Sequence, residues 1–241
     1  MNNNTVVTYV NKICAIFSNL NQPFLCFTHS FAHNVQQAEI NAVDINDDSA
    51  GLGVCGRMAD ILKLNGYSTG TVSVAGGAPA VVSQNTPLLV VNPNGYEKFN
   101  PIGWESVDRD RIKELNKVSS VGSSMFSEIW SDKLFQSLSE NDRLFQQMST
   151  VSTTANFNLR DELGKQMSSI AKLIKTKDAR KTDRDVFYAE IAGFDTHIVQ
   201  ETGLETRLTS VNAAMTAFVN EMKKQTQWNN VAVVFVSEFG R

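Results

Sequence analysis

Cysteine, long apolar runs and excess charge of either sign are all scarce in this 241-residue sequence. Cys14, Cys26 and Cys55 are odd in number and have no CxxC spacing, so they predict buried thiols rather than a disulfide framework or a zinc site. No run approaches the ~18 apolar residues of a membrane span, and the start lacks the features of a secretory signal. The formal net charge of -3 offers no basic surface for nucleic acid. These absences exclude a membrane span and disfavour nucleic acid as a partner, and they leave the localisation open.

The last fifty residues have the pattern of a strand, a helix and a second strand. Residues 186–192 (VFYAEIA) and 231–236 (VAVVFV) are typical of buried strands. Between them one apolar stripe recurs at helical spacing, through Leu204, Leu208, Val211, Met215, Phe218 and Met222. A crossover helix predicts parallel pairing, so both strands should end at the same edge of a sheet. We expect the two strands to be adjacent.

Further elements are predicted upstream. An amphipathic helix is expected over residues 5–20, because Val6, Val10, Ile13 and Phe17 share one face. Other apolar patterns predict strands at residues 24–27, 71–74 and 87–91 and a helix over residues 51–64 that ends at Gly66. The Gly76-Gly77 step lacks the spacing of a phosphate-binding loop, which favours a turn.

The middle of the sequence has little strand character. Residues 108–175 predict three helices separated by serine-rich breaks at 119–124 and 149–154. In the third helix Asn158 is the expected N-cap. Its expected apolar stripe consists of Leu159, Leu163, Met167, Ile170 and Ile174. We interpret this region as a helical layer or cap on the sheet.

Acidic and histidine residues follow the two C-terminal strands. Asp195 and His197 lie two apart, and an extended segment would point both side chains to the same side. Such a pair can hold a divalent cation, although a surface or capping role gives the same spacing. Glu238 follows the second strand, and a shared sheet edge for the two segments favours the metal interpretation.

Hydroxyl side chains follow the strand predicted at residues 24–27. If Thr28 or Ser30 lies at a helix N-terminus, the positive end of the helix dipole favours an anion such as phosphate or sulfate. A hydroxyl in that position can act as a nucleophile once a metal or base activates it. His29 and His33 could share a helix face, but capping by one histidine and solvation of the other explain the spacing as well.

Two C-terminal segments resemble a known family. Residues 193–197 (GFDTH) and 233–241 (VVFVSEFGR) are similar to the GFDTH and FSEFGR motifs of the family called domain of unknown function 1501. That family belongs to the alkaline-phosphatase-like, or sulfatase-like, superfamily. Residues 28–37, 53–60 and 76–79 resemble earlier segments of the family in the same order.

The resemblance implies an α/β fold, an αβα sandwich around a largely parallel sheet, as one domain over residues 1–241 with a helical cap or layer at residues 106–176. It further implies hydrolysis of small anionic phosphate or sulfate esters with a divalent metal ion (Zn, Mn, Mg or Ca). Asp195 and His197 would be metal ligands, and Glu238 would bind the metal or orient a ligand. Ser30 or Thr28 would be the nucleophile, and His29 and Arg241 are further candidates for site residues.

The family pattern also includes segments that this sequence does not show. Relatives have an early Gly-Gly-x-Asp-Gly segment and a later Thr-Asp-His-Gly segment with further ligands, so we expect an incomplete domain that lacks some metal ligands. The alternative is a non-catalytic interaction scaffold built on the same fold. Dinucleotide binding ranks last, because no glycine fingerprint is present. Relatives are often exported, whereas the substrate and oligomeric state are not predicted.

Overall fold

A computed structural model describes residues 6–11, 52–94, 106–116, 124–194 and 200–236. Its strands are β1 Val6–Asn11, β2 Thr69–Ser73, β3 Leu88–Val90, β4 Arg184–Glu190 and β5 Val231–Val236. Its α-helices are α2 Val54–Leu64, α3 Ser106–Leu115, α4 Met125–Ser149, α5 Glu162–Lys175, α6 Lys177–Arg180 and α7 Gln200–Lys224, and short 3-10 helices cover Pro79–Val81 (η1) and Trp228–Asn230 (η2). The prediction of a mixed α/β fold with a parallel sheet is confirmed. None of the described helices is long and apolar enough to cross a membrane.

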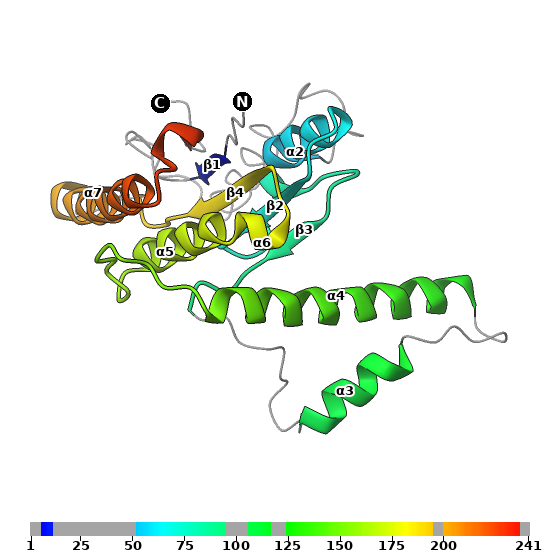
Figure 1. The fold of residues 1–241 in the computed structure, drawn as a ribbon. Coiled ribbons are helices and arrows are strands. Elements are labelled where there is room, and N and C mark those ends of the chain that lie inside the picture. Colours follow the sequence, from blue (N-terminus) through cyan, green and yellow to red (C-terminus); the bar gives the residue numbers. More distant parts are fainter. Residues whose placement is uncertain (1–5, 12–51, 95–105, 117–123, 195–199, 237–241) are drawn as a thin grey trace, which may run out of the picture. The chain divides into compact units, whose positions relative to one another are not determined.

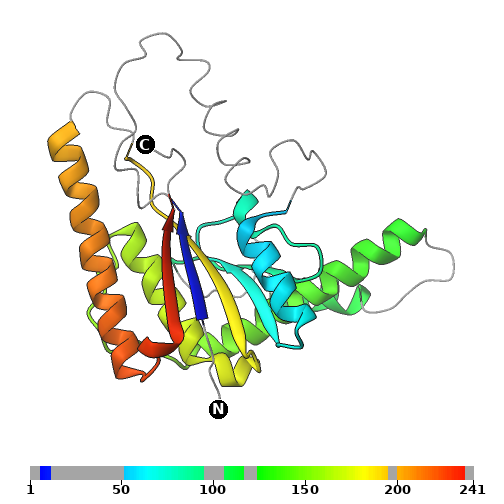
Figure 2. The same ribbon diagram turned by 90° about the horizontal axis from the view of Figure 1, so that it is seen from above.

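The five strands form one sheet in the order β3-β2-β4-β1-β5, and every pairing is parallel. Figure 2 shows β5, β1, β4 and β2 side by side. The strands β4 and β5 are therefore parallel, as predicted, but they are not adjacent. The strand β1 lies between them and pairs with both.

The helix predicted over residues 5–20 is wrong where the structure describes it, because Val6–Asn11 is the strand β1. The apolar spacing of Val6 and Val10 fits a helix, but the segment is also rich in β-branched residues, which favour strands. Two neighbouring strands provide hydrogen-bonding partners along its whole length, from Val6↔Val231 to Asn11↔Glu190. Tertiary pairing therefore overrides the local periodicity.

Helices cover both faces of the sheet, with α2 on one face and α5 on the other (Figure 1). Cys55 and Ala59 of α2 are fully buried in a cluster with Val186 and Tyr188 of β4. Because side chains alternate along a strand, the fully buried Phe187 points to the opposite face, toward α5. The strand β4 is thus buried on both faces, as expected for a central strand of a parallel sheet.

Glycines at the start of α2 allow the helix to approach the backbone of residues 79–83. A Cβ at Gly53 would lie 2.1 Å from the Ala80 carbonyl oxygen, and a Cβ at Gly56 would lie 1.9 Å from the Val82 carbonyl oxygen. The Gly53 N–H also donates to the Val82 carbonyl at 2.8 Å. The glycines of the segment 53–60 are therefore explained by this close packing.

Gly56→Ala is expected to destabilise the protein by about 1–3 kcal/mol, because the added methyl group must push α2 away from rigid backbone. This loss exceeds the gain of about 1 kcal/mol in helix propensity. Gly77→Ala is the control, since a Cβ there meets nothing within 4 Å. Urea denaturation measures both. Equal stability of the two variants would contradict the close packing.

The N-cap of α5 lies three residues later than predicted. Asp161, not Asn158, is the N-cap, and its carboxylate accepts a hydrogen bond from the Gly164 N–H at 2.9 Å. Asn158 instead accepts from the Arg160 N–H at 3.1 Å in a local turn, and Leu159 is exposed. The rest of the predicted stripe is buried, at Leu163, Met167, Ile170 and Ile174.

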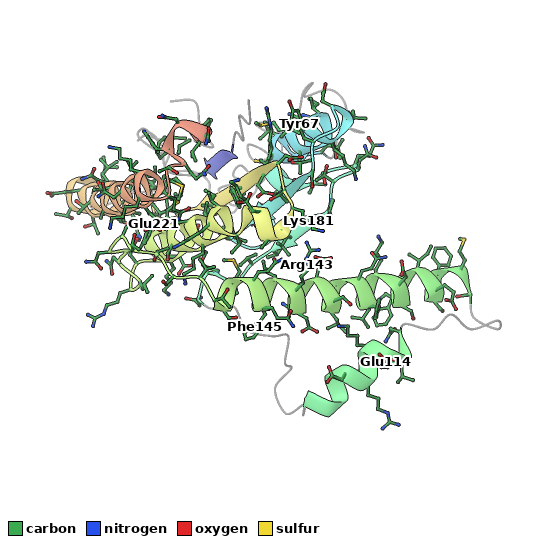
Figure 3. All side chains as sticks on the ribbon, viewed as in Figure 1. Tyr67, Glu114, Arg143, Phe145, Lys181 and Glu221 are labelled. Carbon is green, nitrogen blue, oxygen red and sulfur yellow. The ribbon has the colours of Figure 1, made fainter. Side chains whose placement is uncertain are left out.

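The helix α7 packs against α5 and carries a buried acid. Phe218 and Met222 are fully buried as predicted, whereas Leu208 at the other end of the stripe is exposed. Ser210 donates to the second oxygen of Asp161 at 2.8 Å, which joins the two helices. Glu221, labelled in Figure 3, is fully buried and binds the segment that precedes α5.

The chain divides into two compact units, residues 1–94 with 153–241 and residues 95–152. The second unit contains α3 and α4, joined by an ion pair between Lys113 and Asp142 at 3.2 Å. Ser124 caps α4 by accepting from the Ser127 N–H at 3.3 Å. The three helices predicted for residues 108–175 are confirmed as α3, α4 and α5.

Candidate functional site

The carboxyl edge of the sheet is the candidate site. Because all five strands are parallel, they end at one edge, and in open α/β sheets ligands bind there. The strand β4 ends at Glu190, five residues before Asp195, and β5 ends at Val236, two residues before Glu238. The sequence prediction that both acidic segments follow strands ending at the same edge is thus confirmed for the strands themselves.

The predicted site residues themselves lie outside the described residues. This holds for the metal ligands Asp195, His197 and Glu238. It also holds for the candidates near the N-terminus and at the last position, namely Thr28, His29, Ser30 and Arg241. Their convergence therefore stays a prediction. The described residues contain no group of three or more His, Cys, Asp or Glu side chains that could hold a metal ion.

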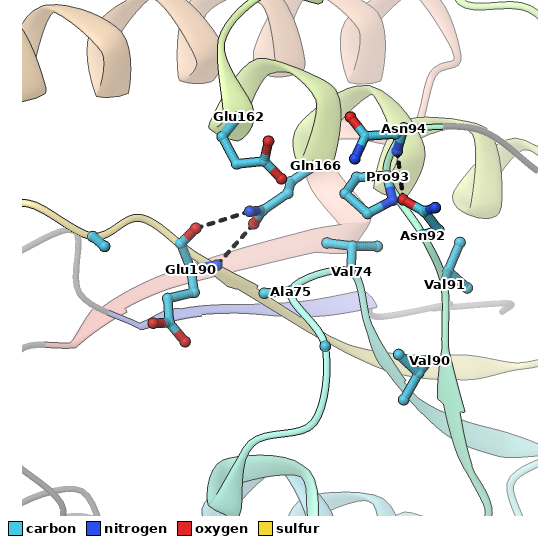
Figure 4. A pocket seen from close by; sticks show the side chains of 12 residues that line it. Val74, Ala75, Val90, Val91, Asn92, Pro93, Asn94, Glu162, Gln166 and Glu190 are labelled. Carbon is cyan, nitrogen blue, oxygen red and sulfur yellow. Dashed lines mark hydrogen bonds between the residues drawn. The ribbon is translucent and has the colours of Figure 1, made fainter.

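A pocket of about 560 Å³ opens at this edge (Figure 4). Its walls come from the ends of β2, β3 and β4 and from the first two turns of α5. The lining residues are Val74, Ala75, Gly76, Val90, Val91, Asn92, Pro93, Asn94, Glu162, Gln166, Glu190 and Ala192. Its volume falls in the range of small-molecule sites. The pocket-lining Ala192 precedes Asp195 by only three residues.

Glu190 and Gln166 form the polar end of the pocket. The Tyr188 hydroxyl donates to the Glu190 carboxylate at 2.8 Å. The Gln166 side chain, which is only 3% exposed, makes two hydrogen bonds to the Glu190 backbone (Figure 4). Gln166 thus fixes the end of β4 and is itself oriented by both bonds.

The opposite wall is a short turn after β3. The Asn94 N–H donates to the Asn92 side-chain oxygen at 3.0 Å, which forms an Asx turn. Lys165 of α5 donates to the Asn94 side-chain oxygen at 2.6 Å and lies 3.6 Å from the Glu162 carboxylate. The loop after β3 is therefore tied to the start of α5.

Carboxylate and amide groups dominate the polar part of the lining. Glu162 supplies oxygen acceptors and Asn92 and Asn94 supply amides, whereas the Glu190 carboxylate points away from Glu162, to the other side of β4 (Figure 4). Such a surface suits a ligand that offers hydroxyl or ammonium donors.

Two buried acids elsewhere have structural roles. Burial by itself would raise the pKa of Asp60, but hydrogen bonds from Gln84, Thr86 and Asn85 outweigh burial and lower the pKa below its ordinary value. These bonds hold the loop that leads into β3, at the amino edge of the sheet. Hydrogen bonds lower the pKa of Glu221 in the same way.

Cys55 is a buried thiol, as predicted. Burial raises its pKa to about 12, so the thiolate that reacts or binds metal is not formed near neutral pH. Cys14 and Cys26 lie outside the described residues.

Sequence reasoning missed the pocket residues. Glu190 has a signal, because it is the single charged residue in an otherwise apolar strand sequence, VFYAEIA. Gln166 has a weaker one, since it is a polar residue beside the buried stripe of α5. For Glu162, Asn92 and Asn94 the sequence indicates only a helix start and a turn.

Fold and pocket define a parallel-sheet α/β protein with a ligand-sized pocket at the carboxyl edge. The family model described as protein of unknown function (DUF1501) matches residues 106–241. This match covers more than half of the sequence, and the protein belongs to that family. The match includes both C-terminal motifs, whereas the segments 28–37, 53–60 and 76–79 precede it. Comparisons with curated proteins and with solved structures find no match.

Proposed function

We propose that this protein is a metal-dependent hydrolase of phosphate or sulfate esters with an alkaline-phosphatase-like fold. The observation that carries the proposal is the parallel exit of β4 and β5 at one sheet edge, each followed within five residues by a predicted metal ligand. Membership of the family and a ligand-sized pocket beside the β4 exit agree with it.

The donor set fits a divalent cation. Asp195 and Glu238 offer carboxylate oxygens and His197 an imidazole nitrogen, and this combination suits Zn or Mn, whereas the oxygens alone suit Mg or Ca. A bound cation would supply Lewis-acid stabilisation of the ester oxygens. Asp195 and His197 would hold it, and Glu238 would bind it or orient a neighbouring ligand.

The hydroxyl of Ser30 or Thr28 would attack phosphorus or sulfur, the bond to the ester alcohol would break, and the proton of the hydroxyl would end on the departing alcohol. Water would then attack the phosphorus or sulfur of the enzyme ester, which releases phosphate or sulfate and restores the hydroxyl. The pocket lined by Glu162, Asn92 and Asn94 would accept the alcohol part, because its acceptors match hydroxyl or ammonium donors.

Asp195→Ala is expected to lower the affinity for the preferred metal ion by about 100-fold or more, since even residues behind the ligands contribute tenfold to a hundredfold. Calorimetric titration with Zn²⁺, Mn²⁺, Mg²⁺ and Ca²⁺ measures the affinity. Turnover of 4-nitrophenyl phosphate and sulfate measures activity. Asp178→Ala is the matched control, because the Asp178 side chain is 88% exposed on α6.

Two results would overturn the proposal. In the first, protein produced from its complete native reading frame contains no metal by elemental analysis and binds none in the titration. In the second, Asp195→Ala changes neither binding nor turnover. Either result favours the alternative of a non-catalytic interaction scaffold on this fold.

A further inference from the structure

The side-chain amide of Asn94, in the wall of the pocket, has a fixed orientation. Its oxygen accepts from the Lys165 ammonium at 2.6 Å, and the Asn94 backbone N–H donates to Asn92 at 3.0 Å. Because the oxygen already faces a donor, the NH2 group lies on the other side of the amide. Within the described ranges this NH2 group donates to no protein acceptor. Asn94 is exposed and lines the pocket, so the NH2 group can donate to a ligand.

The charges of the pocket are close to balanced. The Glu162 carboxylate lies 3.6 Å from the Lys165 ammonium, which also holds Asn94. The Glu190 carboxylate accepts from the Tyr188 hydroxyl on the other side of β4 (Figure 4). One carboxylate with an ammonium beside it attracts neither cations nor anions strongly, because the fields of close opposite charges largely cancel. The pocket therefore suits a neutral ligand better than an ion of either sign.

The hydrogen-bonding groups of the pocket are of two kinds. The Asn94 NH2 group only donates, and the ionised Glu162 carboxylate only accepts. They belong to different walls, Asn94 to the loop after β3 and Glu162 to α5 (Figure 4). An ammonium group cannot accept from Asn94, and a sulfate or ionised carboxylate cannot donate to Glu162. A hydroxyl group both donates and accepts, so several hydroxyls on one ligand can satisfy both walls.

The rest of the lining is mostly aliphatic. Val74 and Val91 are buried beneath the pocket surface, whereas Val90 is 51% exposed. None of the described residues that line the pocket is aromatic, so a nucleobase finds no ring on which to stack. Aliphatic side chains instead make dispersion contacts with the C–H groups of a saturated ring. The volume of about 560 Å³ lies within the range of small-molecule sites.

We propose that this pocket binds a neutral polyol, the class of ligand that includes sugars and cyclitols. The Asn94 amide would donate to its hydroxyl oxygens, Glu162 would accept from its hydroxyl groups, and the valines would contact its C–H groups. The inference goes beyond the proposed function. It depends only on described residues and not on the position of a metal ion.

NMR titration without added metal tests the ligand class. The probes are methyl glucoside as the polyol, cyclohexylammonium as a charged ring, inorganic sulfate as an anion and adenine as a flat base. We expect methyl glucoside to bind with a dissociation constant on the order of 1 mM and to shift the side-chain NH2 signal of Asn94. The other three probes should bind at least about tenfold more weakly, because each lacks a donor, an acceptor or a stacking partner.

Asn94→Asp tests the donor. The aspartate has the same shape and still accepts from Lys165, but it replaces the NH2 group by an acceptor. We expect the affinity for methyl glucoside to fall about tenfold and the affinity for cyclohexylammonium to rise, because the donor is lost and a negative charge is added. Asn229→Asp is the matched control, since Asn229 is exposed and lies just before β5, at the amino edge of the sheet. It should change neither affinity.

Glu162→Ala tests the acceptor and also serves if Asn94→Asp does not fold, which urea denaturation shows. It should weaken methyl glucoside about tenfold as well. The inference is overturned if methyl glucoside does not bind the wild type, or if another probe binds as tightly. It is also overturned if Asn94→Asp and Glu162→Ala both bind methyl glucoside as the wild type does, or if Asn229→Asp weakens it equally. Failure of the metal titration would instead overturn only the proposed function.

Discussion

Asp185→Ala should lower the free energy of unfolding by about 3–5 kcal/mol, because it leaves a buried guanidinium without its counter-ion. Arg180 of α6 donates to the Asp185 carboxylate at 2.5 Å, and the two side chains are 7% and 2% exposed. The same Arg180 nitrogen donates to the Leu173 carbonyl at the end of α5. The pair therefore joins α5, α6 and the start of β4.

A double variant shows whether the loss in Asp185→Ala comes from leaving Arg180 unpaired or from a net stabilising contribution of the ion pair. Arg180→Met combined with Asp185→Leu removes both charges, and such replacements of buried ion pairs are often neutral or stabilising. We expect it to be closer to wild-type stability than Asp185→Ala. Asp178→Ala, which removes a carboxylate that is 88% exposed, should change stability by less than about 0.5 kcal/mol. Urea denaturation of the three variants measures the free energy of unfolding. An unchanged value for Asp185→Ala would contradict a stabilising role for the ion pair with Arg180.

Glu221→Ala is expected to be similarly severe, at about 3–5 kcal/mol, since each buried donor that loses its acceptor contributes about 1–3 kcal/mol. The carboxylate accepts from the N–H groups of Thr154 and Ala155, both at 2.7 Å, from the Thr154 hydroxyl at 3.0 Å and from the Gln225 amide at 2.9 Å. Glu205→Ala on the same helix is the control, because Glu205 is exposed. Equal denaturation midpoints for the two variants would refute the role of Glu221.

The same carboxylate predicts a dependence on pH. Burial would raise the pKa of Glu221, but hydrogen bonds from Gln225, Ala155 and Thr154 outweigh burial and lower the pKa below the ordinary value of 4.5. A lowered pKa in the folded state stabilises the fold above the ordinary pKa, and this contribution disappears as the pH falls through the folded-state pKa. Wild-type stability should therefore fall on acidification below about pH 4.5, and Glu221→Gln should show a shallower fall.

Local signals were sufficient for most elements of the sheet and its helices. The apolar runs of β4 and β5 and the glycine after α2 predicted these elements, because buried strands and left-handed caps restrict residue type strongly. The strand β1 was predicted as part of a helix. The spacing of its apolar residues fits both a helix and a strand, and only pairing with β4 and β5 decides between them. The N-cap of α5 was misplaced because Asn158 and Asp161 are both suitable, and packing selects Asp161.

By itself the sequence determined the parallel direction of β4 and β5, the edge at which they end, and the family. It did so because hydrophobic spacing and short motifs are local properties of the chain. Only the tertiary structure inserted β1 between β4 and β5, placed Gln166 on the backbone of Glu190 and formed the pocket between α5 and the ends of β2, β3 and β4. These features join residues distant in sequence, and a hydrogen bond or pocket between distant residues exists only once the whole sheet and its helices have packed together.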